Sequence, residues 1–178
     1  MSARQRKARS GVSGQGEFGG APLLLTNGFS TMAFIFHPMF QSSFEYSPPI
    51  TVEFEGSSLL EVRFRHVPGA RSPSVLKLKN RDYPVEWQGA AWIDPASGAI
   101  VRISASLMPG LEDLGLKTFA ADVRFSRVKF KDQTAASWLP EVATIEVETA
   151  RQHWRNIHTF DRYRVFAVDV NARTEAPK

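Results

Sequence analysis

The stretch 91–107, AWIDPASGAIVRISASL, brings an aspartate and an arginine close enough in sequence to form a carboxylate–guanidinium pair. In a catalytic interpretation Asp94 is the reacting carboxylate and Arg102 its partner. The intervening residues favour a turn instead. Aspartate accepts hydrogen bonds from turn N–H groups, proline presets its own φ, and glycine takes a positive φ. The sequence therefore predicts a structural corner with no catalytic role, made by Trp92, Asp94, Pro95, Gly98 and Arg102.

Trp92 and Arg102 lie on the two arms that flank this corner. If the two side chains share a face, the Arg102 guanidinium lies over the Trp92 ring in a cation–π contact. Their numbering alone does not decide whether they share a face.

Two glycine-containing segments resemble a dinucleotide-binding motif and a nucleophile elbow, but neither has the flanking residues or elements that the motif requires. Gly14-Gln15-Gly16-Glu17-Phe18-Gly19 fits G-x-G-x-x-G, yet a basic tail precedes it where a strand is needed. Gly28-Phe29-Ser30-Thr31-Met32 begins like a nucleophile elbow but lacks the second glycine. We interpret the first as a linker and Ser30 as a helix cap.

The histidines and the adjacent acid pair do not have the spacing of a metal or acid–base site. His153 and His158 are five residues apart, which puts them on opposite faces of a strand. His66 falls on the apolar side of its strand and is expected to be a hydrogen-bonded core or cavity residue. Adjacent residues such as Glu112 and Asp113 do not face each other, so no shared-proton dyad is expected. The sequence predicts no catalytic residue, no metal site and no cofactor.

The segment 151–164, RQHWRNIHTFDRYR, interleaves basic and aromatic residues, as nucleic-acid-binding surfaces do. The charge balance of the chain argues against nucleic-acid binding. The basic excess lies in residues 1–16, which contain Arg4, Arg6, Lys7 and Arg9 and no acid, and the remaining 18 basic residues equal the 18 acidic ones. We expect an edge strand whose cationic side chains block aggregation, and no nucleic-acid partner.

Length and composition indicate one globular domain. The 178 residues are 43% hydrophobic and 22% charged, with no cysteine and no apolar run of the length that a membrane span requires. The absence of cysteine excludes disulfides, thiolate metal sites and a lipobox anchor. No signal peptide is visible in the chain as written, because a glycine-rich stretch stands where the apolar region should be.

The hydrophobic pattern predicts a mainly β chain. Leu60, Val62, Phe64 and His66 alternate with charged residues, and similar strands follow at 75–79, 85–93, 99–107 and 118–131, with a bulge near Ser126-Arg127. The last of these strands corresponds to TFAADVRFSRVKFK, residues 118–131, and further strands are expected at 142–149 and roughly 157–170. Ser30 or Thr31 is expected to cap one short helix that ends at Phe36 before His37-Pro38, with a buried strand as the competing interpretation.

The connections between these strands are too short for parallel crossovers, so the strands are expected to form a strongly curved antiparallel meander of about seven or eight strands. It either closes into a barrel or stays open, with the N-terminal helix over its concave side. The domain limits are a disordered basic, glycine-rich tail over 1–20, a single half-barrel domain over 21–170 and a disordered tail over 171–178.

Several stretches resemble uncharacterised bacterial cell-envelope proteins whose fold is similar to that of the outer-membrane lipoprotein-sorting proteins, the lipoprotein carrier and its receptor. They are WQGAAWIDPASGAIVRI, WLPEVATIEV, NIHTFDRYRVFAV, FIFHPMFQSSFEY and VRFRHVPG, and the resemblance covers roughly residues 20–170.

This resemblance implies a non-enzymatic protein of the periplasm or cell envelope, with a helical lid over an apolar concave sheet that binds a lipid or acyl chain. The implied partner is a hydrophobic ligand or a lipidated protein. The alternative is a structural or interaction module that docks another envelope protein without a ligand.

Overall fold

The computed structural model describes residues 28–78, 81–110, 115–131, 135–150 and 152–165, and those ranges are mainly β. Within these ranges two 3₁₀-helices come first and ten strands follow. In chain order the elements are η1 (Gly28–Phe36), η2 (Pro38–Ser43), β1 (Phe44–Tyr46), β2 (Ile50–Phe54), β3 (Ser57–His66), β4 (Val75–Leu78), β5 (Arg81–Pro84), β6 (Trp87–Ile93), β7 (Ile100–Leu107), β8 (Leu116–Val128), β9 (Ser137–Thr149) and β10 (His153–Thr159).

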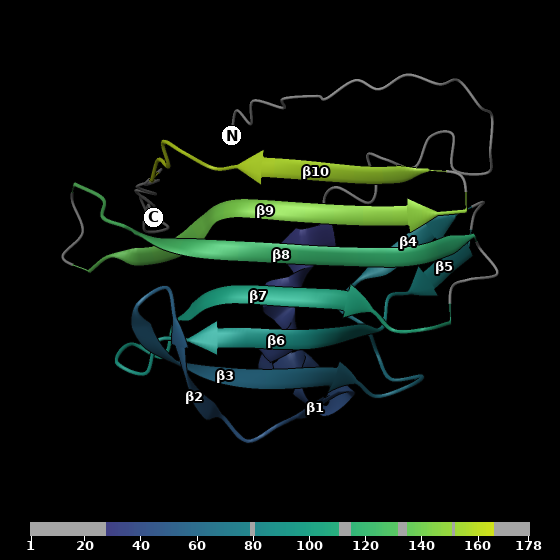
Figure 1. The fold of residues 1–178 in the computed structure, drawn as a ribbon, viewed down its shortest axis with the longest axis horizontal. Helices are drawn as coiled ribbons and strands as arrows, with labels where there is room; N and C mark the ends of the chain where they lie inside the picture. Colours follow the sequence, from purple (N-terminus) through teal and green to yellow (C-terminus); the bar gives the residue numbers. More distant parts are fainter. Residues whose placement is uncertain (1–27, 79–80, 111–114, 132–134, 151, 166–178) are drawn as a thin grey trace, which may run out of the picture.

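Eight of these strands form one antiparallel sheet, shown in Figure 1. Its order is β1-β3-β6-β7-β8-β9-β10, and β2 pairs with the first half of β3 beside β1. β4 and β5 form a separate two-stranded sheet. The predicted fold class, a curved antiparallel meander, is confirmed, and in the described part of the chain the sheet stays open.

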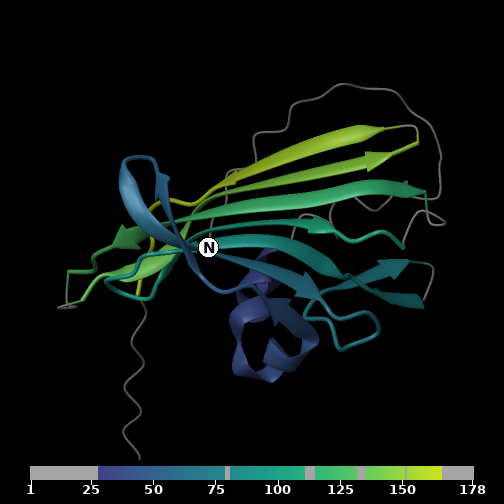
Figure 2. The same ribbon diagram turned by 60° about the horizontal axis from the view of Figure 1, so that its bottom comes forward.

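The protein has two layers. η1, η2 and the β4–β5 hairpin lie against one face of the large sheet, whereas the β2–β3 hairpin curls toward the other side (Figures 1 and 2). One core cluster joins the layers: Met32 and Ile35 from η1 pack with Leu76 of β4 and with the sheet residues Trp87 and Phe119. The helices and the small hairpin therefore close over this face of the sheet.

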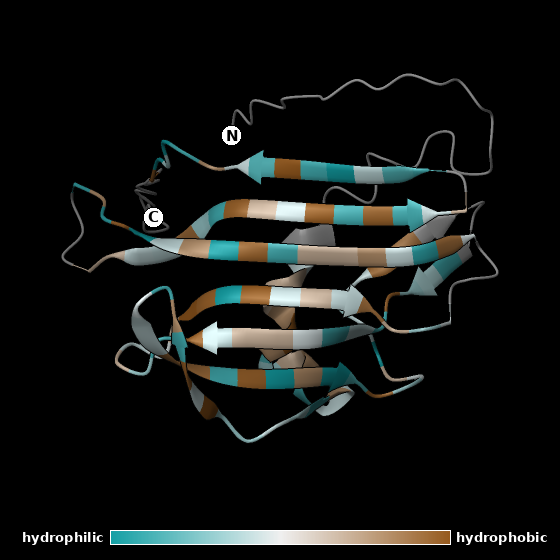
Figure 3. Cartoon of the chain, in the orientation of Figure 1, coloured by the Kyte–Doolittle hydropathy of each residue, from teal (hydrophilic) through white to brown (hydrophobic). Residues whose placement is uncertain are grey.

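Strand periodicity separates the two faces of the large sheet. Phe64, Gly89, Ala105, Ala121 and Ile145 are cross-strand neighbours on the face that the second layer covers, here called the apolar face. Hydrophilic and hydrophobic residues alternate along β3 and β9 in Figure 3, as a sheet with one buried face requires.

The residues at intervening positions form the opposite face, here called the open face. Its central row consists of Arg63, Ala90, Ser104, Asp122 and Thr144.

Gly89 occupies a position on β6 that no side chain fits. A Cβ placed there would lie 2.0 Å from the carbonyl oxygen of Ser104 on β7. At the tip of the β2–β3 hairpin, Glu55 and Gly56 both have positive φ, of 51° and 79°, which is the conformation of a tight two-residue hairpin turn.

Several predicted boundaries differ from the structure. The helix expected up to Phe36 is present as η1, but it is a 3₁₀-helix. It begins at Gly28, so Ser30 and Thr31 lie inside it and the prediction that one of them caps it is wrong. η2 follows because Pro38 suits a first helical position. The competing strand interpretation is wrong. β8 has two register irregularities against β9, one between Leu116 and Thr118 and one between Arg124 and Phe125, the second slightly before the expected bulge.

The last strand begins and ends earlier than the predicted 157–170. β10 ends at Thr159, and Arg162, with φ of 53°, interrupts the extended backbone soon afterwards. Residues 166–170 lie outside the described residues. The same holds for both predicted tails, 1–20 and 171–178, for Gly14 to Gly19, and for the Glu112-Asp113 pair.

No helix in the described ranges has the length and apolar content needed to cross a membrane.

Candidate functional site

The corner between β6 and β7 is held by the Asp94 carboxylate. Its Oδ1 accepts from the Ala96 N–H at 3.0 Å and its Oδ2 from the Ser97 hydroxyl at 2.5 Å. The Gly98 N–H donates to the Asp94 carbonyl at 2.8 Å, and Gly98 has φ of 68°. The hydrogen bonds from Ser97 and Ala96 lower the pKa of the Asp94 carboxyl below its ordinary value. Both carboxylate oxygens of Asp94 thus accept hydrogen bonds that close the turn.

We expect Asp94→Ala to lower the melting temperature slightly at neutral pH and to leave the strands intact. Because the folded pKa is depressed, the stabilisation by Asp94 is complete above its unfolded-state pKa and is lost as the pH falls through the folded one. Thermal melts of wild type and variant should therefore differ at pH 7 and converge in acid. A constant difference down to pH 2 would contradict this role of the carboxylate.

Arg102 sits in a stack of aromatic rings on the open face. Trp92 and Arg102 are directly paired across β6 and β7, so they do share a face, and the guanidinium carbon lies 4.8 Å from the Trp92 ring centroid. The same carbon lies 5.2 Å from the ring of Phe54, which reaches over from the β2–β3 hairpin and stacks on Trp92. Arg102 Nε and Nη2 both donate to Asp122 Oδ2, at 2.8 and 2.6 Å.

Arg102→Ala is expected to lower the free energy of unfolding by about 1–2 kcal/mol, because it removes two ring contacts and a charge-assisted pair that is largely shielded from water. The matched control is Arg63→Ala, whose side chain is 74% exposed against 23% for Arg102. That control should change stability by no more than about 0.5 kcal/mol. Chemical denaturation measures both, and equal effects would contradict the stack.

Two shallow hollows of about 490 and 560 Å³ lie on the open face and share Ser104. Their floor is made largely of small side chains: Ala90, Ser104, Ser106 and Ala120. Five arginines and three carboxylates line them. The arginines are Arg63, Arg65, Arg102, Arg124 and Arg155, and the carboxylates are Glu61, Asp122 and Glu146. The hollows are thus polar and charged.

Each of these carboxylates is bound to an arginine of the same face. Glu61 accepts from Arg63 Nε at 2.9 Å, Asp122 pairs with Arg102, and Glu146 lies 3.2 Å from Arg155 Nε. Arg124 Nη1 donates to Glu55, at the tip of the hairpin, at 3.0 Å. Four of the five arginines thus have a carboxylate partner among the described residues.

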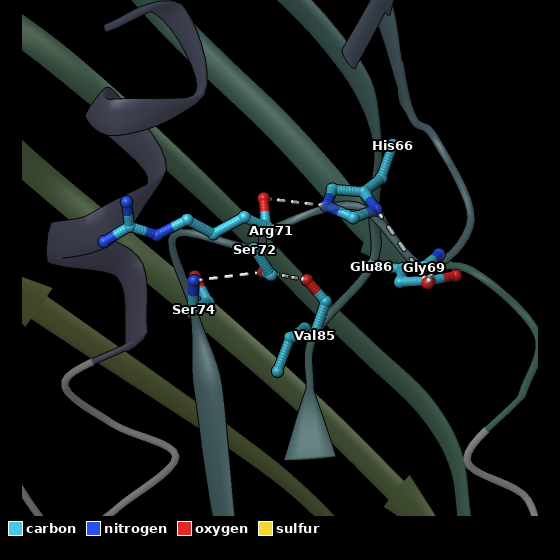
Figure 4. Close-up of polar contacts among 7 residues, drawn as sticks. All are labelled: His66, Gly69, Arg71, Ser72, Ser74, Val85 and Glu86. Atoms are coloured by element: carbon cyan, nitrogen blue, oxygen red, sulfur yellow. Dashed lines mark hydrogen bonds and ion pairs between the residues drawn. The ribbon is translucent and has the colours of Figure 1, made fainter. Parts of the chain in front are cut away.

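A second polar cluster lies beneath the sheet, where the loop 67–74 meets the start of β6 (Figure 4). The His66 side chain is fully buried, with its Nε2 3.4 Å from the Arg71 carbonyl oxygen and its ring edge-on to Phe44. Its Nδ1 is 3.9 Å from Glu86 Oε1, which accepts from the Gly69 N–H at 3.0 Å. His66 is the buried, polar residue that the sequence predicts.

Hydroxyl groups continue this cluster toward η1. Ser72 Oγ donates to the Val85 carbonyl, and Ser74 Oγ accepts from Trp87 Nε1 at 2.9 Å and lies 2.5 Å from Thr31 Oγ1. Neither serine contacts the His66 ring, so the described contacts do not align a nucleophile with a base. They tie the 67–74 loop to β6 and to η1.

The remaining histidines are dispersed. His37 caps η2, with Nδ1 accepting from the Met39 N–H. His153 and His158 lie on opposite faces of β10, and burial lowers the pKa of His158. Among the described residues no three histidine, aspartate or glutamate side chains gather as metal ligands do.

The basic–aromatic segment also divides between the two faces of the sheet. Trp154 packs against the core, whereas Arg155, on the open face, binds Glu146. Arg151 lies outside the described residues.

Phe54, Asp122 and the hollows were not predicted to form one surface. Arginines at alternating positions of several strands were the available signal, because residues of equal phase in paired strands share a face. Which of them become neighbours depends on the strand register.

A scan against protein-family models, a search of curated proteins and a search of solved structures each found no match to this chain.

Proposed function

We propose that the chain is a non-enzymatic binding module whose docking surface is the open face of the large sheet. One observation supports this most strongly: both hollows lie on the open face, while the apolar face is covered by the second layer. Side chains of the apolar face such as Val123 and Ile145 are only 1–2% exposed, so they are packed rather than lining an accessible space. Arginine and tryptophan are also enriched at the centres of protein interfaces.

The resemblance described above is the sole basis for proposing a cell-envelope location and a partner that is itself an envelope protein.

The docking function is tested by filling the hollows. Ser104 is shared by both, and tryptophan is well tolerated in strands, so Ser104→Trp should obstruct the surface while the sheet persists. Fluorescein-labelled hexapeptides of glutamate, glutamine and lysine serve as probes in anisotropy titrations of the whole chain. At least one should bind, and Ser104→Trp should weaken that binding about tenfold or more.

The control for this experiment is Ser58→Trp, at an exposed position near the hairpin tip that does not line the hollows. It should bind the peptides as the wild type does. Binding that Ser104→Trp leaves unchanged, or no binding by any peptide, would contradict docking on the open face.

Acyl-chain binding beneath the helices is the second candidate, and the character of η1 favours it. η1 is a nine-residue 3₁₀-helix, and runs of this type longer than three or four residues are uncommon because their hydrogen-bond geometry is poor. Such a helix is more easily displaced from the apolar face than an α-helix of equal length.

An engineered disulfide distinguishes acyl-chain binding beneath η1 from docking on the open face. The Thr31 and Ser74 hydroxyls are 2.5 Å apart and the chain has no cysteine, so Thr31→Cys with Ser74→Cys should allow oxidation to fasten η1 to the loop. If an acyl chain enters beneath η1, a fluorescent fatty acid should bind the reduced variant and not the oxidised one. Equal binding by both forms, or none by the wild type, would contradict acyl binding.

A further inference from the structure

We infer that the occupant of the open face is an acidic, extended segment of a partner protein, an inference that rests on the proposed function. The hollows are lined by five arginines against three carboxylates, and each carboxylate is already bound to one arginine. Arg65 and Arg124 have no carboxylate partner among the residues that line the hollows. Arg124 contacts Glu55 outside the hollows, whereas Arg65 forms no ion pair with any residue in the described ranges, although Glu45 is its cross-strand neighbour on β1.

The ion pairs on this face leave most guanidinium donors available. A guanidinium carries five N–H donors in a planar fork. Arg63 and Arg155 each use Nε for their carboxylate, and Arg124 uses one Nη. Incoming carboxylates can therefore bind the remaining N–H donors of these arginines.

The shape of the surface favours an extended chain. The hollows meet at Ser104 and together extend from Arg63 on β3 to Arg155 on β10, so an occupant crosses the strands. The floor of alanines and serines between them lets a peptide backbone approach the sheet closely. Alternating acidic side chains would then meet arginines on both sides.

The labelled hexaglutamate peptide tests this inference against a matched pair of charge reversals. Arg65→Glu with Arg155→Glu changes the open face, and Lys129→Glu with Lys131→Glu makes the same change in charge at exposed positions outside the hollows. The first variant should bind hexaglutamate about tenfold or more weakly than the wild type, and the second within about twofold. Binding by the wild type should weaken as the ionic strength rises to about 0.15 M.

The outcomes also separate this inference from the proposed function. Preferential binding of the glutamine or lysine peptide, abolished by Ser104→Trp, would keep docking on the open face and overturn an acidic occupant. An equal loss of hexaglutamate affinity in the two charge-reversed variants would also overturn an acidic occupant. The arginines of the open face would then affect binding only through the net charge of the protein. If the reversed variant fails to fold, Arg65→Gln with Arg155→Gln takes its place, and unchanged affinity in that variant overturns the inference.

Discussion

Trp87→Ala is expected to lower the free energy of unfolding by about 3–5 kcal/mol, the range for removing a large aromatic side chain from a core. Trp87 is 0% exposed, its ring lies 4.9 Å from that of Phe119, and its Nε1 donates to Ser74 at the junction between the two layers. The substitution thus removes packing from the sheet and leaves a buried hydroxyl with one partner fewer. Urea or guanidinium denaturation measures the change.

Trp154→Ala is the matched control, because Trp154 is only half-buried, on the edge strand β10. It should cost clearly less than Trp87→Ala. Trp87→Phe keeps an aromatic ring but removes the Nε1 donor. Its free energy of unfolding should fall by about 1 kcal/mol more than the smaller ring alone explains, because the hydrogen bond to Ser74 is lost. If Trp87→Ala were no more destabilising than Trp154→Ala, Trp87 would not be the junction of the two layers.

Gly89→Ala is expected to destabilise the protein by about 3 kcal/mol or more, at the upper end of the cost of overpacking, although it adds a single methyl group. The added carbon would lie 2.0 Å from the Ser104 carbonyl oxygen and 2.8 Å from the Ala105 Cα, both backbone atoms of the paired strand. Backbone cannot rotate aside as a side chain can, so β6 and β7 must separate locally.

Gly56→Ala provides the contrast for this prediction. Gly56 has positive φ but nothing within 4 Å of the added carbon, so alanine there meets conformational strain alone, about 1–2 kcal/mol. Thermal melts and hydrogen exchange of the β6 and β7 amides should show much the larger effect for Gly89→Ala. Equal effects of the two substitutions would mean that β6 and β7 are not as close as described.

The local features of this fold could be predicted because they are encoded in neighbouring residues. Alternation along 60–66 predicts β3, and the Asp94-Pro95 step with Gly98 predicts the corner, since turn chemistry and a period of two act over a few residues. The helix before the strands was predicted on the same basis. Its 3₁₀ character was not, because the choice between the two helix types depends on packing against the sheet.

The candidate docking surface could not be predicted, because it depends on strand register. Whether Trp92 and Arg102 face each other depends on a register shift between Trp92 and Ile93, which the numbering of the two arms does not reveal. Asp122 and Phe54 reach Arg102 from β8 and from a hairpin far earlier in the chain. The hollows are lined by residues of several paired strands, so they depend on the register as well.

The most direct test of the central claim, that partners dock on the open face, is to map the binding site by NMR. Backbone amide shifts of the ¹⁵N-labelled chain are followed while the hexaglutamate peptide is added. The account predicts that the largest changes cluster on the open face, around Arg63, Ser104 and Asp122, and that η1 and the β4–β5 hairpin are little affected. Changes concentrated in η1 and β4–β5, with the open face unchanged, would contradict it.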